Sequence, residues 1–221
     1  TTDGDGLSEM PKGKNARPLH AVEISLITQW IKEGALDDSP AGENNLYTMS
    51  QKPIYQKLPL IRSLAFSPNG RNLAQNGYHE VLIADTSSGK VVARLIGLSE
   101  RIESVAFSPN GKWLAVAGGK PGKMGEIQIW DWEKEKLLLS HSVTYDTLYG
   151  VSWSPDGNFV AFGASDNAVR VLNAKSGEAV VYMAGHDDWV RGTVFSDDGK
   201  SVFSVSRDKT VKQTDLQTER F

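Results

Sequence analysis

The chain has 221 residues, and its 24 Lys and Arg against 27 Asp and Glu give a formal net charge of −3 at pH 7. A hydrophobic content of 39% is enough for a core, while the absence of cysteine excludes disulfides and thiolate metal sites. The charges form no basic stripe suited to nucleic acid, and no apolar run is long enough for a membrane span.

Near the N-terminus, apolar residues at helical spacing predict one amphipathic helix over residues 20–33. Ile24, Ile27 and Ile31 lie at positions i, i+3 and i+7, and Trp30 widens the same face. Because a helix of this length is marginal in water by itself, we expect another part of the protein to cover this face.

Residues 41–60 are rich in Pro, Gly and Asn and have no sustained period, which predicts an interdomain linker. Two alternatives are open for this linker. Its apolar residues, such as Tyr47, Ile54 and Tyr55, could pack against the structure that follows, or the segment could be a solvated tether. The composition favours the tether.

From residue 61 onward, one pattern occurs four times. Its aromatic position falls at Phe66, Phe107, Trp153 and Phe195, so the copies are 41, 46 and 42 residues apart. Each copy begins with a β-prone run that ends in a turn of the Ser-Pro-Asn-Gly type. Further short alternating runs follow, although the last copy lacks its fourth run. This period predicts one propeller blade per copy, with the aromatic residues facing the core.

Motifs within the copies resemble those of the WD-repeat family. The matching positions are Gly185-His186, Phe195-Ser196, Ser204, Asp208 and Asp215 in the fourth copy and Trp130-Asp131 in the second. The resemblance implies a mainly β fold, a partial WD-repeat β-propeller of about four blades in an open arc. The blades are expected at about 61–97, 98–142, 143–184 and 185–221.

The same resemblance implies a structural hydrogen-bond set inside the blades, made of His186, Ser204, Asp208, Asp166 and Trp130. His186, Ser204 and Asp208 also have the residue types of a hydrolase triad. No Gly-x-Ser-x-Gly turn accompanies them, so we favour the structural role and expect no enzyme.

The residues before the repeats add a second resemblance. The Met10-Pro11 step and the helix with its Trp-Ile-Lys-Glu-Gly-Ala ending resemble the C-terminal part of a c-type cytochrome domain, of the planctomycete kind that is fused to a WD-repeat propeller. The resemblance assigns residues 1–40 to this cytochrome remnant. It implies that Met10 is an axial ligand of the iron of haem c in the complete protein, and that the protein is periplasmic or otherwise extracytoplasmic.

The Cys-x-x-Cys-His motif that attaches such a haem is absent, so we expect no haem on this chain, which we interpret as a fragment. Two functions are then open. The first is an electron-transfer cytochrome fused to a propeller that acts as a protein-interaction scaffold, and the alternative is a pure protein-binding propeller with no redox role. Either way we expect protein partners at propeller loops, such as the one with Asp187, Asp188, Trp189 and Arg191.

Overall fold

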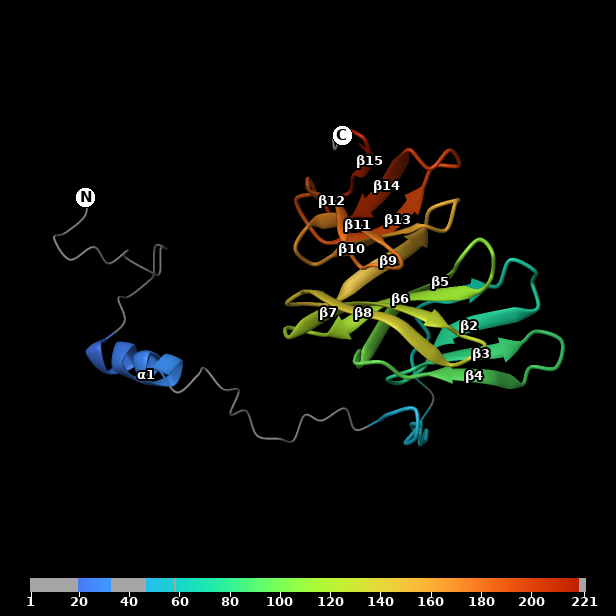
Figure 1. Ribbon diagram of the computed structural model, residues 1–221, viewed down its shortest axis with the longest axis horizontal. Coiled ribbons are helices and arrows are strands. Elements are labelled where there is room, and N and C mark those ends of the chain that lie inside the picture. Colours follow the sequence, from blue (N-terminus) through green and yellow to red (C-terminus); the bar gives the residue numbers. More distant parts are fainter. Residues whose placement is uncertain (1–19, 33–46, 58, 219–221) are drawn as a thin grey trace. The chain divides into compact units, whose positions relative to one another are not determined.

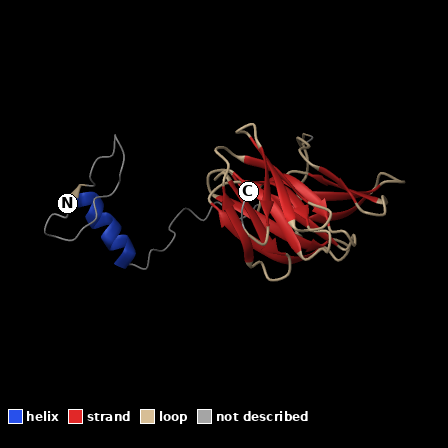
Figure 2. Ribbon diagram, turned by 90° about the horizontal axis from the view of Figure 1, so that it is seen from above, coloured by secondary structure: helices blue, strands red, loops and turns tan. Residues whose placement is uncertain are grey.

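The computed structural model describes residues 20–32, 47–57 and 59–218. These residues form one helix, α1 (Ala21–Lys32), and fifteen strands (Figure 1). The chain divides into two units, residues 1–44 and residues 45–221, with the helix in the first and every strand in the second. Figure 2 shows the second unit as strands joined by loops, so the predicted mainly β fold is confirmed.

The strands form four antiparallel sheets, each made from one continuous stretch of chain with the strands in chain order. The first sheet has β1 (Leu64–Phe66), β2 (Asn72–Asn76), β3 (Val81–Asp85) and β4 (Val91–Leu95). The second has β5 (Arg101–Phe107), β6 (Trp113–Lys120), β7 (Met124–Asp131) and β8 (Lys136–Thr144). The third has β9 (Leu148–Trp153), β10 (Phe159–Ala164), β11 (Ala168–Asn173) and β12 (Ala179–Ala184). The fourth has β13 (Val190–Phe195), β14 (Ser201–Ser206) and β15 (Val211–Asp215). This arrangement is consistent with a WD-repeat propeller.

A tight turn joins the first two strands of every sheet. In the first sheet the amide of Gly70 donates to the carbonyl of Ser67 at 2.8 Å, and the Ser67 hydroxyl donates to Asn69 Oδ1 at 2.8 Å. Gly70 has a φ of +70°, which glycine adopts without a steric penalty. The same bonds recur at residues 108–111, 154–157 and 196–199, which confirms the turns predicted from the repeated motif.

Neighbouring sheets meet mainly through their innermost strands, β1, β5, β9 and β13, and Figure 1 shows the sheets following one another from the first to the fourth. Each of the three junctions contains a cluster of buried hydrophobic side chains. Trp153 on β9 is 8% exposed, and its Nε1 donates to the carbonyl of Ala106 on β5 at 2.9 Å. The aromatic residue of a copy thus packs against the sheet that precedes it.

Phe66 holds the same repeat position in the first sheet but is 66% exposed. The prediction that all four aromatic residues face the core is therefore wrong for Phe66. The reason lies in the packing direction seen at Trp153, because among the described residues no sheet precedes β1 and covers Phe66.

The described part of the predicted linker, residues 47–57 and 59–60, lies partly against the first sheet. The Tyr55 hydroxyl donates to Glu80 Oε1 at 2.5 Å, and Glu80 is fully buried. Arg94 donates to both oxygens of Glu80, at 2.6 and 2.7 Å, and to the carbonyl of Pro53 at 2.8 Å. A plain solvated tether does not describe this segment, because a buried carboxylate needs hydrogen-bond partners and Tyr55 supplies one.

Helix α1 begins at Ala21, one residue later than predicted, and extends to Lys32, while residue 33 lies outside the described residues. Ile24 and Ile27 are 52% and 44% exposed, so the expected cover over the apolar face is not found at these two residues. The side chains of Trp30 and Ile31 lie outside the described part of the structure.

Candidate functional site

A hollow of about 320 Å³ lies where the four innermost strands begin. It is lined by Arg62 just before β1, Glu103 on β5, Tyr149 and Gly150 on β9, and Arg191 on β13. Four segments that are far apart in the sequence therefore contribute to one place, because the sheets stack with their innermost strands side by side.

Next to this hollow, two arginine and two aromatic side chains form a continuous stack. The rings of Tyr149 and Trp189 are stacked, with centroids 6.0 Å apart and an angle of 16° between their planes. The Arg191 guanidinium lies 4.2 Å from the Tyr149 ring centroid, and the Arg207 guanidinium lies 4.8 Å from that of Trp189. Each arginine is thus held over the face of an aromatic ring, where the ring quadrupole attracts a cation.

The hollow and the stack together contain four arginines, Arg62, Arg101, Arg191 and Arg207, and their ion pairs involve two carboxylates, Glu103 and Asp188. Arg62 Nε and Arg101 Nε lie 3.5 and 3.8 Å from Glu103 Oε1, so two arginines share one carboxylate. Arg207 Nε lies 3.5 Å from an oxygen of Asp188. Among the described residues, no carboxylate lies within ion-pair distance of the exposed Arg191. We define the arginine–aromatic face as Arg62, Arg101, Glu103, Tyr149, Asp188, Trp189, Arg191 and Arg207.

The backbone fixes this face through close contacts. Gly150 has a φ of +53°, and a Cβ there would lie 2.2 Å from the Cα of Gly192. Only glycine permits this approach of β9 to β13, which places Tyr149 beside Arg191. The amide of Arg207 donates to the carbonyl of Trp189 at 3.0 Å, which anchors the turn that carries the second arginine.

The arrangement is suited to recognition of a protein surface. Burial raises the pKa of Tyr149, although the positive charge of Arg191 opposes part of this effect, so the phenol is neutral at physiological pH. Trp, Tyr and Arg are the residue types that supply most of the binding energy in protein interfaces. Side chains that are already held in place lose little conformational entropy when they bind a partner.

The structure brings together three residues of the predicted hydrogen-bond set. His186 Nε2 lies 2.8 Å from Ser204 Oγ, and His186 Nδ1 lies 2.7 Å from Asp208 Oδ2. His186 and Ser204 are 5% and 1% exposed, so this hydroxyl is enclosed within the blade. Burial raises the pKa of Asp208, but hydrogen bonds from Thr210, the Asp187 amide and His186 outweigh it and hold that pKa below its usual range.

Asp166 and Trp130, the other two residues of the predicted set, lie elsewhere and have other partners. Asp166 forms a two-point ion pair with Arg170 on β11. Trp130 is 1% exposed, and its Nε1 donates to Gln128 Oε1 at 2.7 Å.

Trp130 belongs to a buried polar network in the second sheet that the motifs did not reveal. Gln128 donates to Glu126 Oε2 at 2.6 Å, and the Ser99 hydroxyl donates to the same oxygen at 2.6 Å. The Ser140 hydroxyl donates to the other oxygen of Glu126 at 2.5 Å. The only sequence signal is that Glu126 and Gln128 alternate with Ile127 and Ile129 in one β-prone run.

Met10, the predicted haem ligand, lies outside the described residues. In the described parts of the chain, no group of three or more His, Asp or Glu side chains is placed to hold a metal ion. No helix in those parts combines the length and the apolar character needed to cross a membrane.

Two family models match the chain. The model described as eukaryotic translation initiation factor eIF2A matches residues 24–176, and the model described as WD domain, G-beta repeat matches residues 177–215.

Several curated proteins are also similar. Periodic tryptophan protein 2 homolog of Caenorhabditis elegans is 29% identical over 140 residues, which is 63% of this chain and 15% of that protein. Nuclear distribution protein nudF of Emericella nidulans is 35% identical over 48% of this chain and 28% of its own length. Nuclear distribution protein PAC1 of Coccidioides posadasii is 28% identical over 93% of this chain and 42% of its own length. The matches thus span less than half of each relative.

These matches overturn the resemblance to a planctomycete-type cytochrome. The first model begins at residue 24, so it includes most of the helix that had been assigned to a cytochrome remnant, and the similar proteins are WD-repeat proteins. The error has a physical reason, because a short amphipathic helix and a Met-Pro step occur in many folds. The haem and the extracytoplasmic location, which only that resemblance implied, are predictions that no observation tests.

Proposed function

The chain belongs to the family of the eukaryotic translation initiation factor eIF2A model and carries a WD repeat at residues 177–215, and from this premise we propose that it is a non-catalytic scaffold that binds other proteins. The WD-repeat relatives support protein partners. Their names refer to different proteins and processes, so the feature carried over to this chain is the WD-repeat architecture alone.

The observation that carries the proposal is the stack of Arg207, Trp189, Tyr149 and Arg191. It combines the residue types of interface hot spots with a net positive charge and a fixed geometry. We infer that the arginine–aromatic face is the main docking surface and that its partner is a protein segment rich in Asp and Glu, because such a segment neutralises the excess arginine charge.

A non-catalytic role fits the surroundings of Ser204. A nucleophile must reach its substrate, whereas this hydroxyl is buried between His186 and the body of the fourth sheet. We interpret the His186, Ser204 and Asp208 contacts as a structural set that fixes the turns of this blade.

We also infer that the four sheets are consecutive blades of a partial WD-repeat propeller in an open arc. Leu64 and Phe66 on β1 are 59% and 66% exposed, and Val205 and Val211 in the fourth sheet are 45% and 67% exposed. Such uncovered faces and sheet edges favour self-association. Light scattering of the chain should therefore show association that grows with concentration, and a monomer at every concentration would contradict the open arc.

The docking proposal is tested by affinity purification from a lysate of the source cells with quantitative mass spectrometry. The test variant combines Arg191→Glu with Arg101→Glu, which reverses two exposed charges of the face. The control combines Arg71→Glu with Lys175→Glu, two exposed cations in turns at the other ends of the strands. Both variants change the net charge equally and leave the buried core intact.

The proposal predicts at least one protein with an acidic segment that is retained by the wild type and the control and is reduced about tenfold or more by the test variant. A tenfold loss corresponds to about 1.4 kcal/mol, which is modest for two hot-spot arginines. If the test variant and the control retain the same proteins at the same levels, the arginine–aromatic face is not the docking surface.

A further inference from the structure

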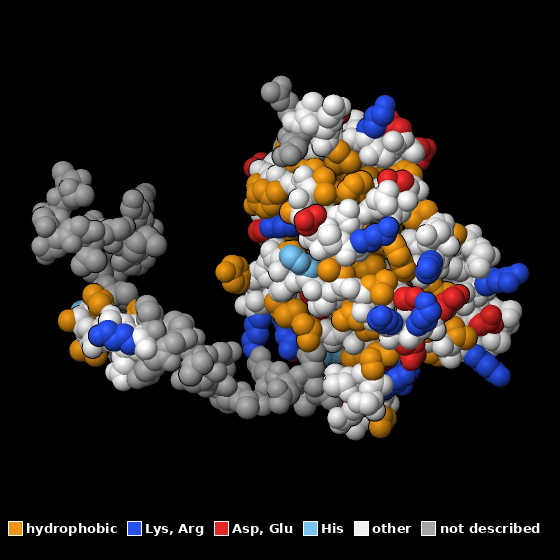
Figure 3. All heavy atoms as spheres, viewed as in Figure 1, with side chains coloured by type: hydrophobic (Ala, Val, Ile, Leu, Met, Phe, Trp, Pro, Cys, Tyr) orange, Lys and Arg blue, Asp and Glu red, His pale blue; other side chains and the backbone are white. Residues whose placement is uncertain are grey.

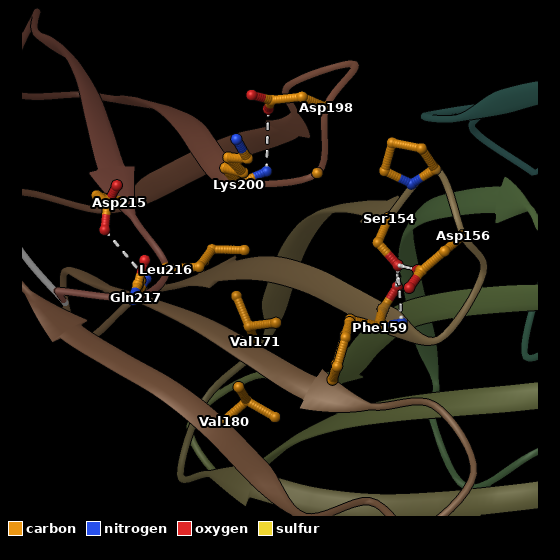
Figure 4. A pocket seen from close by; sticks show the side chains of 12 residues that line it. Ser154, Asp156, Phe159, Val171, Val180, Asp198, Lys200, Asp215, Leu216 and Gln217 are labelled. Carbon is orange, nitrogen blue, oxygen red and sulfur yellow. Dashed lines mark hydrogen bonds between the residues drawn. The ribbon is translucent and has the colours of Figure 1, made fainter.

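A cavity of about 400 Å³ lies at the junction of the third and fourth sheets (Figure 4). It is lined by the turns that follow β9 and β13, whereas the arginine–aromatic face lies where these strands begin. The two sites are thus at opposite ends of the same strands. In Figure 4, apolar side chains of Phe159, Val171, Val180 and Leu216 lie toward the middle of the cavity.

The junction of the first and second sheets has a smaller hollow of about 320 Å³ at the corresponding place, lined mainly by polar residues and by one bulky residue that the cavity lacks. Trp132, directly after β7, is 7% exposed and packs in the junction of the first and second sheets beside this hollow, where its Nε1 donates to the carbonyl of Gly111 at 2.9 Å. Leu216, directly after β15, is the equivalent residue at the cavity and is much smaller.

The junction of the second and third sheets is filled from another position. Trp113, the first residue of β6, packs against Trp153 with ring centroids 6.2 Å apart. The first residue of β10 is Phe159, which lines the cavity. Two junctions therefore receive a tryptophan of their own, and the third has space for one.

Charge distinguishes this junction as well. The turn position held by Asn69 and Asn110 in the first two sheets is held by Asp156 and Asp198 in the last two. Both carboxylates lie on the rim of the cavity together with Asp215, and Lys200 is the one cation among the lining residues.

Hydrogen bonds keep these three carboxylates ionised. The Ser154 hydroxyl lowers the pKa of Asp156, the Ser196 hydroxyl lowers that of Asp198, and the Thr218 amide lowers that of Asp215. On β12, Val180 lines the cavity and is 43% exposed, and Tyr182 beside the cavity is 55% exposed. Figure 3 shows hydrophobic side chains gathered over this strand. The cavity thus has an apolar floor and a negatively charged rim, and an exposed apolar surface lies next to it.

We propose that this cavity is a second docking site, which receives one large apolar side chain of a partner protein from a short segment with Lys or Arg on both sides of that residue. The apolar floor favours the anchor because burial removes its surface from water. The rim favours the flanking cations by charge complementarity and disfavours acidic neighbours. This site is independent of the arginine–aromatic face and has the opposite charge preference.

The test is NMR of the methyl groups of the full chain titrated with three capped peptides. The first peptide is Gly-Lys-Trp-Lys-Gly, the second replaces both Lys with Glu, and the third replaces Trp with Ala. The first should shift the methyl signals of Val171, Val180 and Leu216, because an indole ring in the cavity changes the field at these groups. The other two peptides should bind at least tenfold more weakly.

Variants separate the anchor from the charge. Leu216→Trp should weaken binding of the first peptide at least tenfold, because the new ring occupies the cavity as Trp132 occupies its own junction. Asp156→Asn with Asp198→Asn should weaken it severalfold and reduce its dependence on salt. These two changes preserve the turns, because Asn makes the same hydrogen bonds in the first two sheets. Asp85→Asn, at the end of β3 in the first sheet, is the control and should leave binding unchanged.

Three results would overturn the proposal. One is equal binding of the Lys and Glu peptides, and another is an absence of methyl shifts at the cavity with the first peptide. The third comes from sedimentation: if the chain self-associates and Leu216→Trp abolishes this association, the cavity serves a second copy of the chain. Methyl spectra of the variants show whether each remains folded, so a loss of binding is not confused with unfolding.

Discussion

Replacing Trp153 with Ala should lower the free energy of unfolding by about 3–5 kcal/mol, the usual cost of removing a buried large aromatic residue. Trp153 is 8% exposed and lies in the cluster between the second and third sheets. Its indole also donates to the carbonyl of Ala106, and this bond contributes about 1 kcal/mol of the total.

Phe66→Ala is the matched control, because Phe66 holds the same repeat position but is 66% exposed. Since only about a third of its surface is buried, its removal should cost roughly 1 kcal/mol. The two variants therefore separate the effect of burial from the effect of the repeat position.

Urea unfolding followed by far-ultraviolet circular dichroism measures both costs without relying on tryptophan fluorescence. With a slope of about 1–3 kcal/mol per molar urea, Trp153→Ala should lower the midpoint by more than about 1 M. If Trp153→Ala lowers the free energy of unfolding by less than about 1 kcal/mol, or if both variants lower it equally, Trp153 does not pack on the preceding sheet as described.

Three further predictions concern single groups. Folding lowers the pKa of Asp208 from 3.8, so the charged carboxylate stabilises the fold above that pH. The difference in unfolding free energy between the wild type and Asp208→Asn should therefore be constant above about pH 5 and shrink as the pH falls below about 4. Urea unfolding at a series of pH values measures this difference. Burial and the hydrogen bond to Glu80 raise the pKa of Tyr55 to about 12, so Glu80→Gln should lower that pKa. A carbon-13 NMR titration of the tyrosine rings measures the pKa, and an unchanged value in the variant would contradict this contact. Gly150→Ala should greatly reduce the yield of folded protein, because the added Cβ meets the backbone of β13. Gly70→Ala has open space around the added Cβ and should cost only about 1–2 kcal/mol, because alanine disfavours the positive φ. Equal thermal stability of the two variants would refute this difference.

The sheets could be predicted from the sequence because their determinants are local. Each sheet pairs strands that are adjacent in the chain, and the Ser-Pro-Asx-Gly turn specifies where the first strand ends. The exposure of Phe66 could not be predicted from the repeat itself. It depends on whether another sheet precedes β1, and the four aligned aromatic positions look equivalent in sequence.

The candidate site was predicted only in part. Trp189 and Arg191 were recognised because they precede or begin a strand next to a loop, where binding residues of repeat proteins gather. Tyr149 was missed because its alternating run reads as core, and its contact with Trp189 spans two sheets. The cavity beside Leu216 was also invisible in the motifs, since it lies between two sheets and each motif describes one copy.

The helix gave the wrong family because its signal is general. Ile24, Ile27 and their neighbours show that one face is apolar, but this pattern holds no information about what covers that face. The repeated motif of the second unit contains turns, strand lengths and a fixed period together, and it therefore identified the WD-repeat architecture correctly.

The way the sheets meet also has a mechanical consequence. Each sheet is a continuous stretch of chain that contacts its neighbours chiefly through one or two inner strands, so a force applied to residues 59 and 218 is carried from sheet to sheet in series. Such an array yields at its weakest member first, and the remaining sheets keep their own strand pairing. Every sheet that gives way releases one copy of 41 to 46 residues, which is about 140 to 160 Å of extended chain. The molecule would then lengthen in discrete steps, and each unfolded sheet would fold again when the force falls.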